Sequence, residues 1–147
     1  GKRALPMYHF DKAQTIVSIG ADFLGTWGSS SLNTKQYSKG RKVSAKNPKM
    51  SKHIQFEGVM SLSGMNSDER YVCRPSEFGR IAAALMTALD GGATNLGDAY
   101  LDKAVKDTAK ALQAGNGLVV SGSNDENVQT VVNAINSKII FFILSSY

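Results

Sequence analysis

The sequence predicts an α/β fold, a Rossmann-like three-layer sandwich with a mainly parallel sheet. Short β-branched runs alternate with amphipathic helical stripes along the chain of 147 residues, as they do in proteins built from βαβ units. A strand, a glycine turn and the start of a helix also follow one another directly within Gly117–Ile135. The length fits one domain, and we expect residues 1–147 to form a single α/β domain.

Four segments are predicted to be strands. Thr15–Gly20 and Gly117–Ser121 are short β-branched runs of the kind found in buried parallel strands. His53–Met60 begins with alternating polar and apolar side chains, and Tyr71–Cys73 is a very short extended piece before a proline. The fourfold recurrence of such runs supports a sheet rather than an all-helical fold.

Four helices are predicted from apolar periodicity and from their end signals. Leu32–Lys39 ends at a glycine, and Ser76 caps a helix whose apolar stripe extends to Leu89. Asp98–Ala114 is a second amphipathic stripe, and Ser123–Glu126 forms a capping box that starts the last helix. We expect the intervening segments Ala21–Ser31, Arg41–Ser51 and Ser61–Glu69 to be loops.

Residues 139–147 allow two interpretations. The apolar run Ile139–Leu144 is either a further buried strand or an artefact of where the piece was cut. If the run is exposed, it is a candidate to mediate artificial dimers. No stretch of the chain approaches the ~20 apolar residues that span a bilayer.

The positive charge of the chain is concentrated in one segment. The formal net charge is +5, and no acidic residue lies between Asp22 and Glu57. That interval contains Lys35, Lys39, Arg41, Lys42, Lys46, Lys49 and Lys52. We expect Lys35, Lys39, Arg41 and Lys42, together with Trp27 in the preceding loop, to form an interface with a partner protein. A polyanion- or nucleic-acid-binding module through Lys35–Lys52 is an alternative, but the segment carries no aromatic residue except Tyr37, so no nucleic acid is expected.

Metal and catalytic motifs are not found in the sequence. The one cysteine, Cys73, cannot form an internal disulfide and cannot hold an iron–sulfur cluster unaided. His9 and His53 match no metal-ligand spacing with it, and His53 is expected at the surface of a strand end. Because phosphate-binding glycine loops and nucleophile elbows are also missing, we predict no catalytic residue and no metal ligand.

Asp22, Glu57, Ser123 and Asn124 are the candidate residues of a remnant ligand pocket. Asp22, Ser123 and Asn124 follow predicted strands and Glu57 lies near the end of one, and ligands of parallel sheets bind beyond the carboxyl ends of the strands. Glu57 suits a ribose or base edge, and the turn at Ser123 and Asn124 offers backbone amides to an anion. The structural interpretation is favoured: Asp22 and Glu57 order loops, and the capping box of Ser123 and Glu126 satisfies the amides.

Several stretches taken together resemble one family, the large iron–sulfur subunit of bacterial alternative complex III, a quinol:electron-acceptor oxidoreductase. The resemblance covers about residues 4–136. It is carried most strongly by Ile16–Trp27 (IVSIGADFLGTW) and Met50–Glu57 (MSKHIQFE). Further similar pieces are Tyr8–Ala13 (YHFDKA), Thr34–Arg41 (TKQYSKGR), Met60–Gly64 (MSLSG), Arg74–Glu77 (RPSE) and Leu118–Asp125 (LVVSGSND).

The resemblance implies a fragment of a molybdopterin-oxidoreductase-like domain that has lost its molybdenum cofactor. In that family a ferredoxin-like part of the same chain holds the iron–sulfur clusters, so no cofactor is expected in this fragment. Relatives that bind the pterin carry a proline-glycine-threonine-aspartate turn, whereas this chain has Pro75-Ser76-Glu77-Phe78. The departure disfavours molybdopterin binding, because serine replaces the glycine that lets a backbone approach the ligand closely.

The resemblance also implies the function, the partners and the location. We expect a non-catalytic structural domain of an iron–sulfur subunit that serves respiratory electron transport. Its partners are the cluster-bearing domain of the same parent chain and sister subunits of a membrane complex. The location that the resemblance implies is the periplasmic side of the bacterial inner membrane, where the protein is peripheral. The alternative within this family is an oxidoreductase domain that binds molybdopterin guanine dinucleotide.

Overall fold

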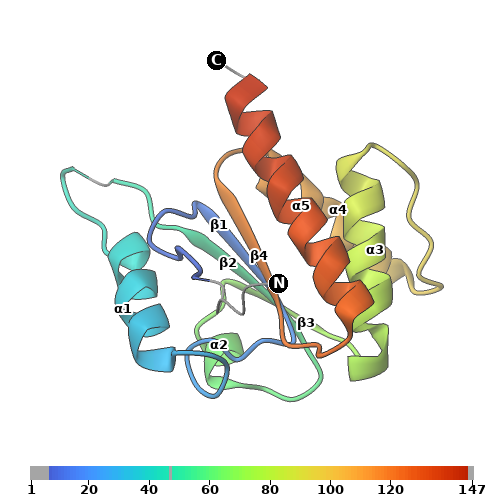
Figure 1. The fold of residues 1–147 in the computed structure, drawn as a ribbon, viewed down its shortest axis with the longest axis horizontal. Coiled ribbons are helices and arrows are strands. Elements are labelled where there is room, and N and C mark those ends of the chain that lie inside the picture. Colours follow the sequence, from blue (N-terminus) through green and yellow to red (C-terminus); the bar gives the residue numbers. More distant parts are fainter. Residues whose placement is uncertain (1–6, 47, 146–147) are drawn as a thin grey trace, which may run out of the picture.

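The computed structural model describes residues 7–46 and 48–145, with side chains to residue 140, and contains one parallel sheet (Figure 1). Its strands are β1 (Thr15–Ile19), β2 (Lys52–Glu57), β3 (Glu69–Val72) and β4 (Gly117–Ser121). They lie in the order β3-β2-β1-β4, and every neighbouring pair is parallel. The prediction of a Rossmann-like α/β sandwich is therefore confirmed.

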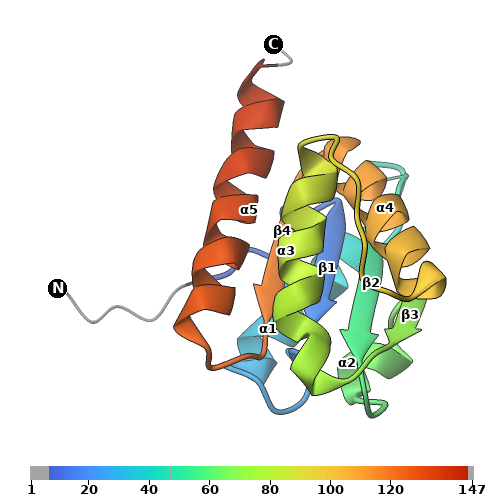
Figure 2. The same ribbon diagram turned by 90° about the vertical axis from the view of Figure 1, so that its right-hand side faces the viewer.

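Helices cover both faces of the sheet (Figure 2). One face carries α1 (Ser30–Arg41) and α2 (Leu62–Met65), which connect strands in the direction β1 to β3. The other face carries α3 (Phe78–Leu89), α4 (Ala99–Gln113) and α5 (Glu126–Ser145), and a short 3-10 helix, Pro75–Glu77, precedes α3. Because parallel crossovers are right-handed, the chain changes face when the path returns across the sheet from β3 to β4.

Two apolar clusters fill the spaces between the layers. The larger cluster includes Ile54 and Phe56 of β2, which pack towards α3, α4 and α5. The smaller one lies on the other face, around Phe10, Phe23 and Tyr37. Both faces of the central strands are buried, as expected of a parallel sheet between two helical layers.

The prediction of a strand at Ile139–Leu144 is wrong, because these residues lie in α5. Val132, Ile135 and Ile139 are buried on one side of that helix, so the apolar stripe of its first half continues into the run. Ile140 is 58% exposed. The side chains beyond it and residues 146–147 lie outside the described part.

The ends of the other helices differ in detail from the prediction. Leu62–Met65 is a short helix inside a segment expected to be a loop. Ser76 caps no helix, because Arg74 and Glu77 form the capping contacts of the 3-10 turn instead. At α5 the predicted box does not form: Asp125 accepts a hydrogen bond from the Asn127 amide, and the Ser123 amide donates to Ser121 Oγ.

Candidate functional site

The switch point of the sheet lies between β1 and β4, where ligands of open α/β sheets bind. Here the two loops touch. The Gly122 amide donates to the carbonyl of Ile19 at 3.0 Å, and Ser121 Oγ donates to the same oxygen at 3.2 Å. A Cβ atom on Gly122 would overlap the carbonyl of Gly20, so the backbones leave no room even for a methyl group. The turns after β1 and β4 are therefore in direct backbone contact at the switch point.

Phe78 covers the same position from the side of α3. A Cβ atom on Gly20 would overlap the Phe78 ring, and Gly20 has a φ of +72°, which favours glycine. The Phe78 ring therefore fills the space above the end of β1.

Asp22 follows β1 and binds the chain itself. Its Oδ1 accepts hydrogen bonds from the amide and the hydroxyl of Ser63, both at 2.9 Å. Its Oδ2 accepts from the amide and the hydroxyl of Thr26, at 3.2 and 3.3 Å. Burial alone would raise the pKa of Asp22, but these four hydrogen bonds outweigh it and hold the pKa below its usual value.

Glu57 ends β2 and is only 4% exposed. Its Oε1 accepts from Arg70 Nε at 2.6 Å and from the Ser61 amide at 3.2 Å, and its Oε2 accepts from Ser61 Oγ at 2.6 Å and from Gln55 Nε2 at 3.2 Å. Burial favours a higher pKa for Glu57, whereas the bonds from Ser61 and Arg70 lower it and win.

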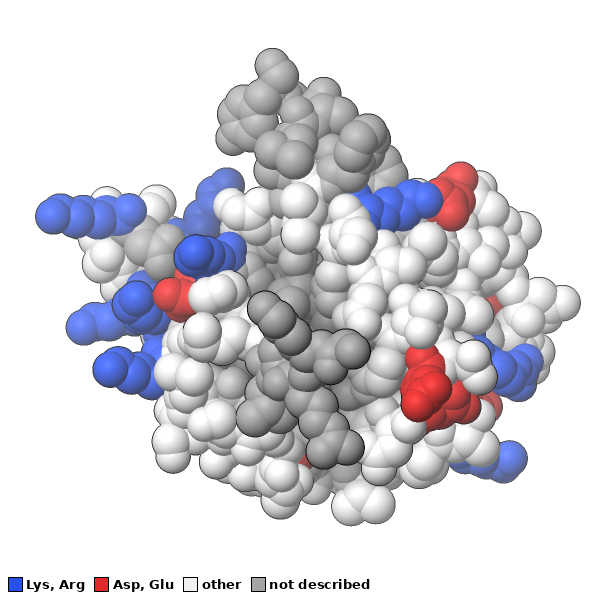
Figure 3. Space-filling model, viewed as in Figure 1, with Lys and Arg blue, Asp and Glu red and all other residues white. Residues whose placement is uncertain are grey.

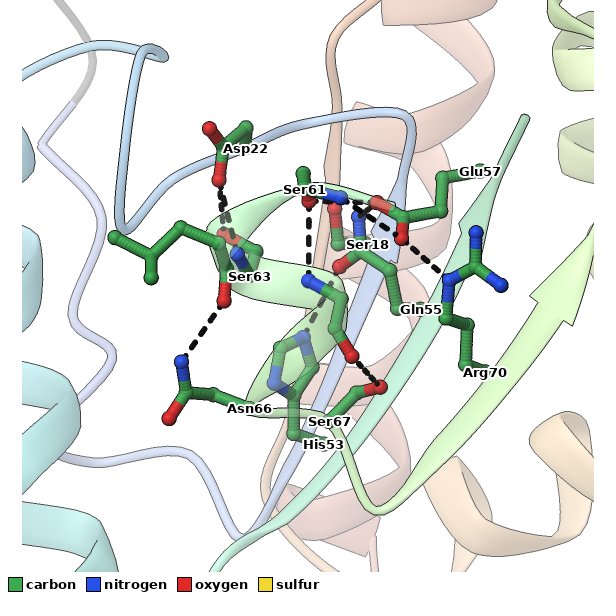
Figure 4. Close-up of polar contacts among 12 residues, drawn as sticks. Ser18, Asp22, His53, Gln55, Glu57, Ser61, Ser63, Asn66, Ser67 and Arg70 are labelled. Carbon is green, nitrogen blue, oxygen red and sulfur yellow. Dashed lines mark hydrogen bonds and ion pairs between the residues drawn. The ribbon is translucent and has the colours of Figure 1, made fainter. Parts of the chain in front are cut away.

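The two carboxylates meet at one element, the segment around α2 (Figure 4). Asp22 holds Ser63 from the loop after β1, and Glu57 holds Ser61 from the end of β2. Leu24 adds a third anchor, because its amide donates to Ser63 Oγ at 3.0 Å. The structure thus brings Asp22 and Glu57 together, but around serines rather than around an open pocket.

A row of buried polar side chains leads to this cluster along β2. His53, Gln55 and Glu57 point to the face of α1 and α2, and His53 Nε2 lies 3.1 Å from Gln55 Oε1. The hydroxyl of Tyr37 lies 3.1 Å from His53 Nδ1 and 3.0 Å from the carbonyl of Asn66. Burial lowers the pKa of His53 to about 4. The expectation that His53 lies at the surface is wrong, since its side chain is fully buried.

Ser123 and Asn124 lie in the turn between β4 and α5. Ser123 is half-buried, and its carbonyl accepts a hydrogen bond from Gln129 Nε2 at 2.6 Å; Asn124 is exposed. None of the hydrogen bonds described for Ser123 joins it to Asp22 or Glu57. The four residues predicted for a remnant pocket therefore occupy two separate places along the carboxyl edge.

The basic residues gather on the flank formed by α1 and the segment after it (Figure 3). Lys35, Lys39 and Lys42 are exposed. Arg41 is half-buried: it binds Asp68 through both terminal nitrogens at 2.5 and 2.9 Å and lies over the Tyr37 ring. Lys39 contacts Asp11 at 3.3 Å.

Trp27 is the other residue predicted for the interface. It is half-buried, and its ring centroid lies 5.1 Å from that of Tyr8. The indole therefore anchors the loop after β1 on the smaller apolar cluster. It also lines a surface hollow of about 610 Å³ together with Leu32 and Met7.

Among the described residues no group of three histidine, cysteine or acidic side chains is arranged to hold a metal ion. Burial raises the pKa of the Cys73 thiol to about 11, which disfavours the thiolate form that metals bind. Within the same part of the chain, no helix has the length and hydropathy to span a bilayer. In comparisons with known proteins, no protein-family model matches the chain and no curated protein is significantly similar to it.

Proposed function

We propose that this chain is a non-catalytic structural domain of a larger redox protein. The observation that carries the proposal is the close packing at the switch point, where the backbones at Gly20 and Gly122 touch and the Phe78 ring covers Gly20. The ring takes up part of the region beyond the strand ends in which open α/β sheets bind their ligands.

The polar side chains of the carboxyl edge support the same proposal. Asp22 and Glu57 each accept four hydrogen bonds from the chain itself. A ligand that recruited either carboxylate would leave donors of the chain unpaired, and those of the buried Ser63 and Gln55 would cost about 1–3 kcal/mol each. Both acids are thus better suited to fix α2 than to bind a small molecule.

The parent protein in this proposal is the large iron–sulfur subunit of a respiratory quinol:electron-acceptor oxidoreductase resembling alternative complex III. The support is the resemblance of IVSIGADFLGTW and MSKHIQFE. In that setting the domain positions the cluster-bearing part of the chain and sister subunits, on the periplasmic side of the bacterial inner membrane. The cationic flank of Lys35, Lys39 and Lys42 suits an acidic partner surface.

The experiment is a cofactor assay on the chain and on its parent, purified without oxygen. In both samples we expect far less than one molybdenum atom and far less than one guanine nucleotide or pterin per chain. We expect iron in the parent alone. One bound pterin or nucleotide per chain would contradict the structural role. Phe78→Ala is the informative variant: it removes the ring above Gly20 but keeps the contact between Gly20 and Gly122, so we expect no guanine nucleotide binding, and a gain of binding would identify the ring alone as the closing element.

The second candidate function, binding of a polyanion through Lys35–Lys52, is favoured by the exposure of Lys35, Lys46 and Lys49. It requires retention on heparin and binding to duplex DNA that weakens steeply as salt rises. We expect the acidic-partner role instead, with elution from heparin at low salt. Retention at moderate salt that is lost in Lys35→Glu and Lys49→Glu would favour the polyanion function.

A further inference from the structure

The segment from Gly58 to Ser67 has an inverted distribution of polar and apolar side chains. Ser63 is fully buried, while Val59, Met60, Leu62 and Met65 are 85%, 58%, 49% and 69% exposed. Soluble helices normally bury their apolar side chains and expose their serines. We call these four exposed residues the apolar platform.

Hydrogen bonds to two acidic side chains fix the backbone that carries the platform. Glu57 and Asp22 bind Ser61 and Ser63, and Ser61 Oγ accepts a hydrogen bond from the Gly64 amide at 3.0 Å. A Cβ atom on Gly64 would overlap the Glu57 carboxylate, so the helix lies directly on that side chain. An apolar surface that is already ordered loses little conformational entropy when another protein covers it.

A cavity of about 650 Å³ adjoins the platform. Val59 belongs to both, because it also lines the cavity together with Val72, Pro75, Leu96 and Leu101. The apolar platform and the hollow therefore adjoin at Val59. In a two-fold symmetric interface between identical chains each copy supplies both halves of the contact, so each copy offers its platform and receives the platform of the other.

The charges at this edge also suit a second copy. The chain has a net charge of +5, but no charged residue lies between Glu57 and Asp68. The rim of the cavity carries both signs, with Arg74 opposed by Glu77 and Asp98. Two copies can therefore meet here without the repulsion that the cationic flank around α1 would cause.

A contact between strand edges is disfavoured at β4. Asn136 of α5 accepts from the Val119 amide and donates to the Val119 carbonyl, both at 2.8 Å, so its side chain takes the place of a neighbouring strand. Gln129 binds the carbonyl of Ser121 at 3.1 Å in the same way. These bonds cover the outer edge of β4 and block strand addition there.

We propose that the chain forms a two-fold symmetric dimer in which the apolar platform of each copy packs into the cavity of the other. The proposal goes beyond the structural role argued above and does not depend on the identity of the parent. It assigns a role to the two acids as well: Asp22 and Glu57 pre-order a surface for self-association.

The test is sedimentation equilibrium over a concentration series, with three variants. We expect a reversible dimer for the unaltered chain. Met65→Lys and Met60→Lys each place a charge in the interface of both copies and should weaken dimerisation about tenfold or more. Ile140→Lys, on the exposed side of α5, is the matched control and should leave the dimer unchanged.

Two results would overturn the proposal. One is a monomer at every concentration up to about 1 mM, the range of the weakest specific complexes. The other is a dimer that Ile140→Lys abolishes and the platform variants do not, which would assign association to the apolar run in α5. Circular dichroism shows whether each variant is folded. Because Met65 and Met60 are substituted separately and both are exposed, a folding defect in one leaves the other to decide.

Discussion

The burial of His53 has the clearest consequence at the scale of single residues. Its imidazole lies between Tyr37 and Gln55 and has no contact with solvent. The low pKa of about 4 means that the folded protein keeps the ring neutral where an unfolded chain would already be protonated.

We therefore expect stability to fall when the pH drops below 7. A histidine in the unfolded chain titrates near 6.5, so between 6.5 and about 4 the unfolded chain binds more protons than the folded one. The stabilisation is complete above this window and is lost through it, by about 3 kcal/mol in total at 1.36 kcal/mol per pKa unit. Urea unfolding at pH 7, 6 and 5 measures this slope.

The control for the pH dependence removes the other histidine. His9→Gln, at an exposed position, should keep the slope between pH 7 and 5, whereas His53→Gln should flatten it. Equal slopes for His53→Gln and the unaltered chain would assign the acid sensitivity to other groups.

The burial of the polar row on β2 could not be predicted from the sequence pattern. Alternation in His53–Glu57 correctly predicts that Ile54 and Phe56 share one face, but it suggests that His53, Gln55 and Glu57 face solvent. They are buried because α1 and α2 cover the second face of a central parallel strand. The signal that indicates this burial is the predicted parallel sheet, because helices cover the inner strands of such a sheet on both sides.

At the scale of elements, the strands and long helices follow from local periodicity, and the exceptions have a tertiary cause. The helix α2 has four residues, too few to be stable alone, and depends on Asp22 and Glu57 for its shape. The end of α5 was misjudged because a short apolar run has no periodicity that separates strand from buried helix.

The edge of β4 gives a prediction for α5. Asn136→Ala removes both hydrogen bonds to Val119 and leaves the Val119 amide and carbonyl without these partners. We expect a loss of about 1–3 kcal/mol in the free energy of unfolding, measured by urea denaturation. Asn133→Ala, on the exposed side of the same helix, is the control and should change stability by less than about 0.5 kcal/mol. Equal losses for both variants would mean that the edge bonds contribute nothing specific.

At the scale of the whole molecule, one polar network joins three strands to α2. Arg70 of β3 binds Glu57 of β2, which binds Ser61, and Asp22 after β1 binds Ser63 (Figure 4). The candidate residues Asp22 and Glu57 could be named from their place after strands. Their partners could not, because Ser61 and Ser63 lie in a segment whose fold depends on the assembled sheet.

Glu57→Gln tests this network. The glutamine side chain carries an NH2 donor where the carboxylate accepts hydrogen bonds from Ser61 and Arg70, so we expect α2 to open more often. The backbone amides of Ser61, Gly64 and Met65 should then exchange hydrogen about tenfold faster or more. Hydrogen exchange measured by NMR gives the rates. Glu69→Gln, which weakens the partly exposed pair with Lys52 and the hydrogen bond from the Tyr71 hydroxyl without touching Glu57, should leave the same amides unchanged.

The contact between Gly20 and Gly122 bears on how this fold can change. A pocket that is blocked by one side chain reopens with one substitution, but here main chain meets main chain, and no replacement of a residue can remove a carbonyl. Installing a dinucleotide at this point would therefore require moving the turn after β1 or β4 as well as deleting an aromatic ring. An engineer seeking a new binding site in this protein would do better to begin elsewhere on its surface.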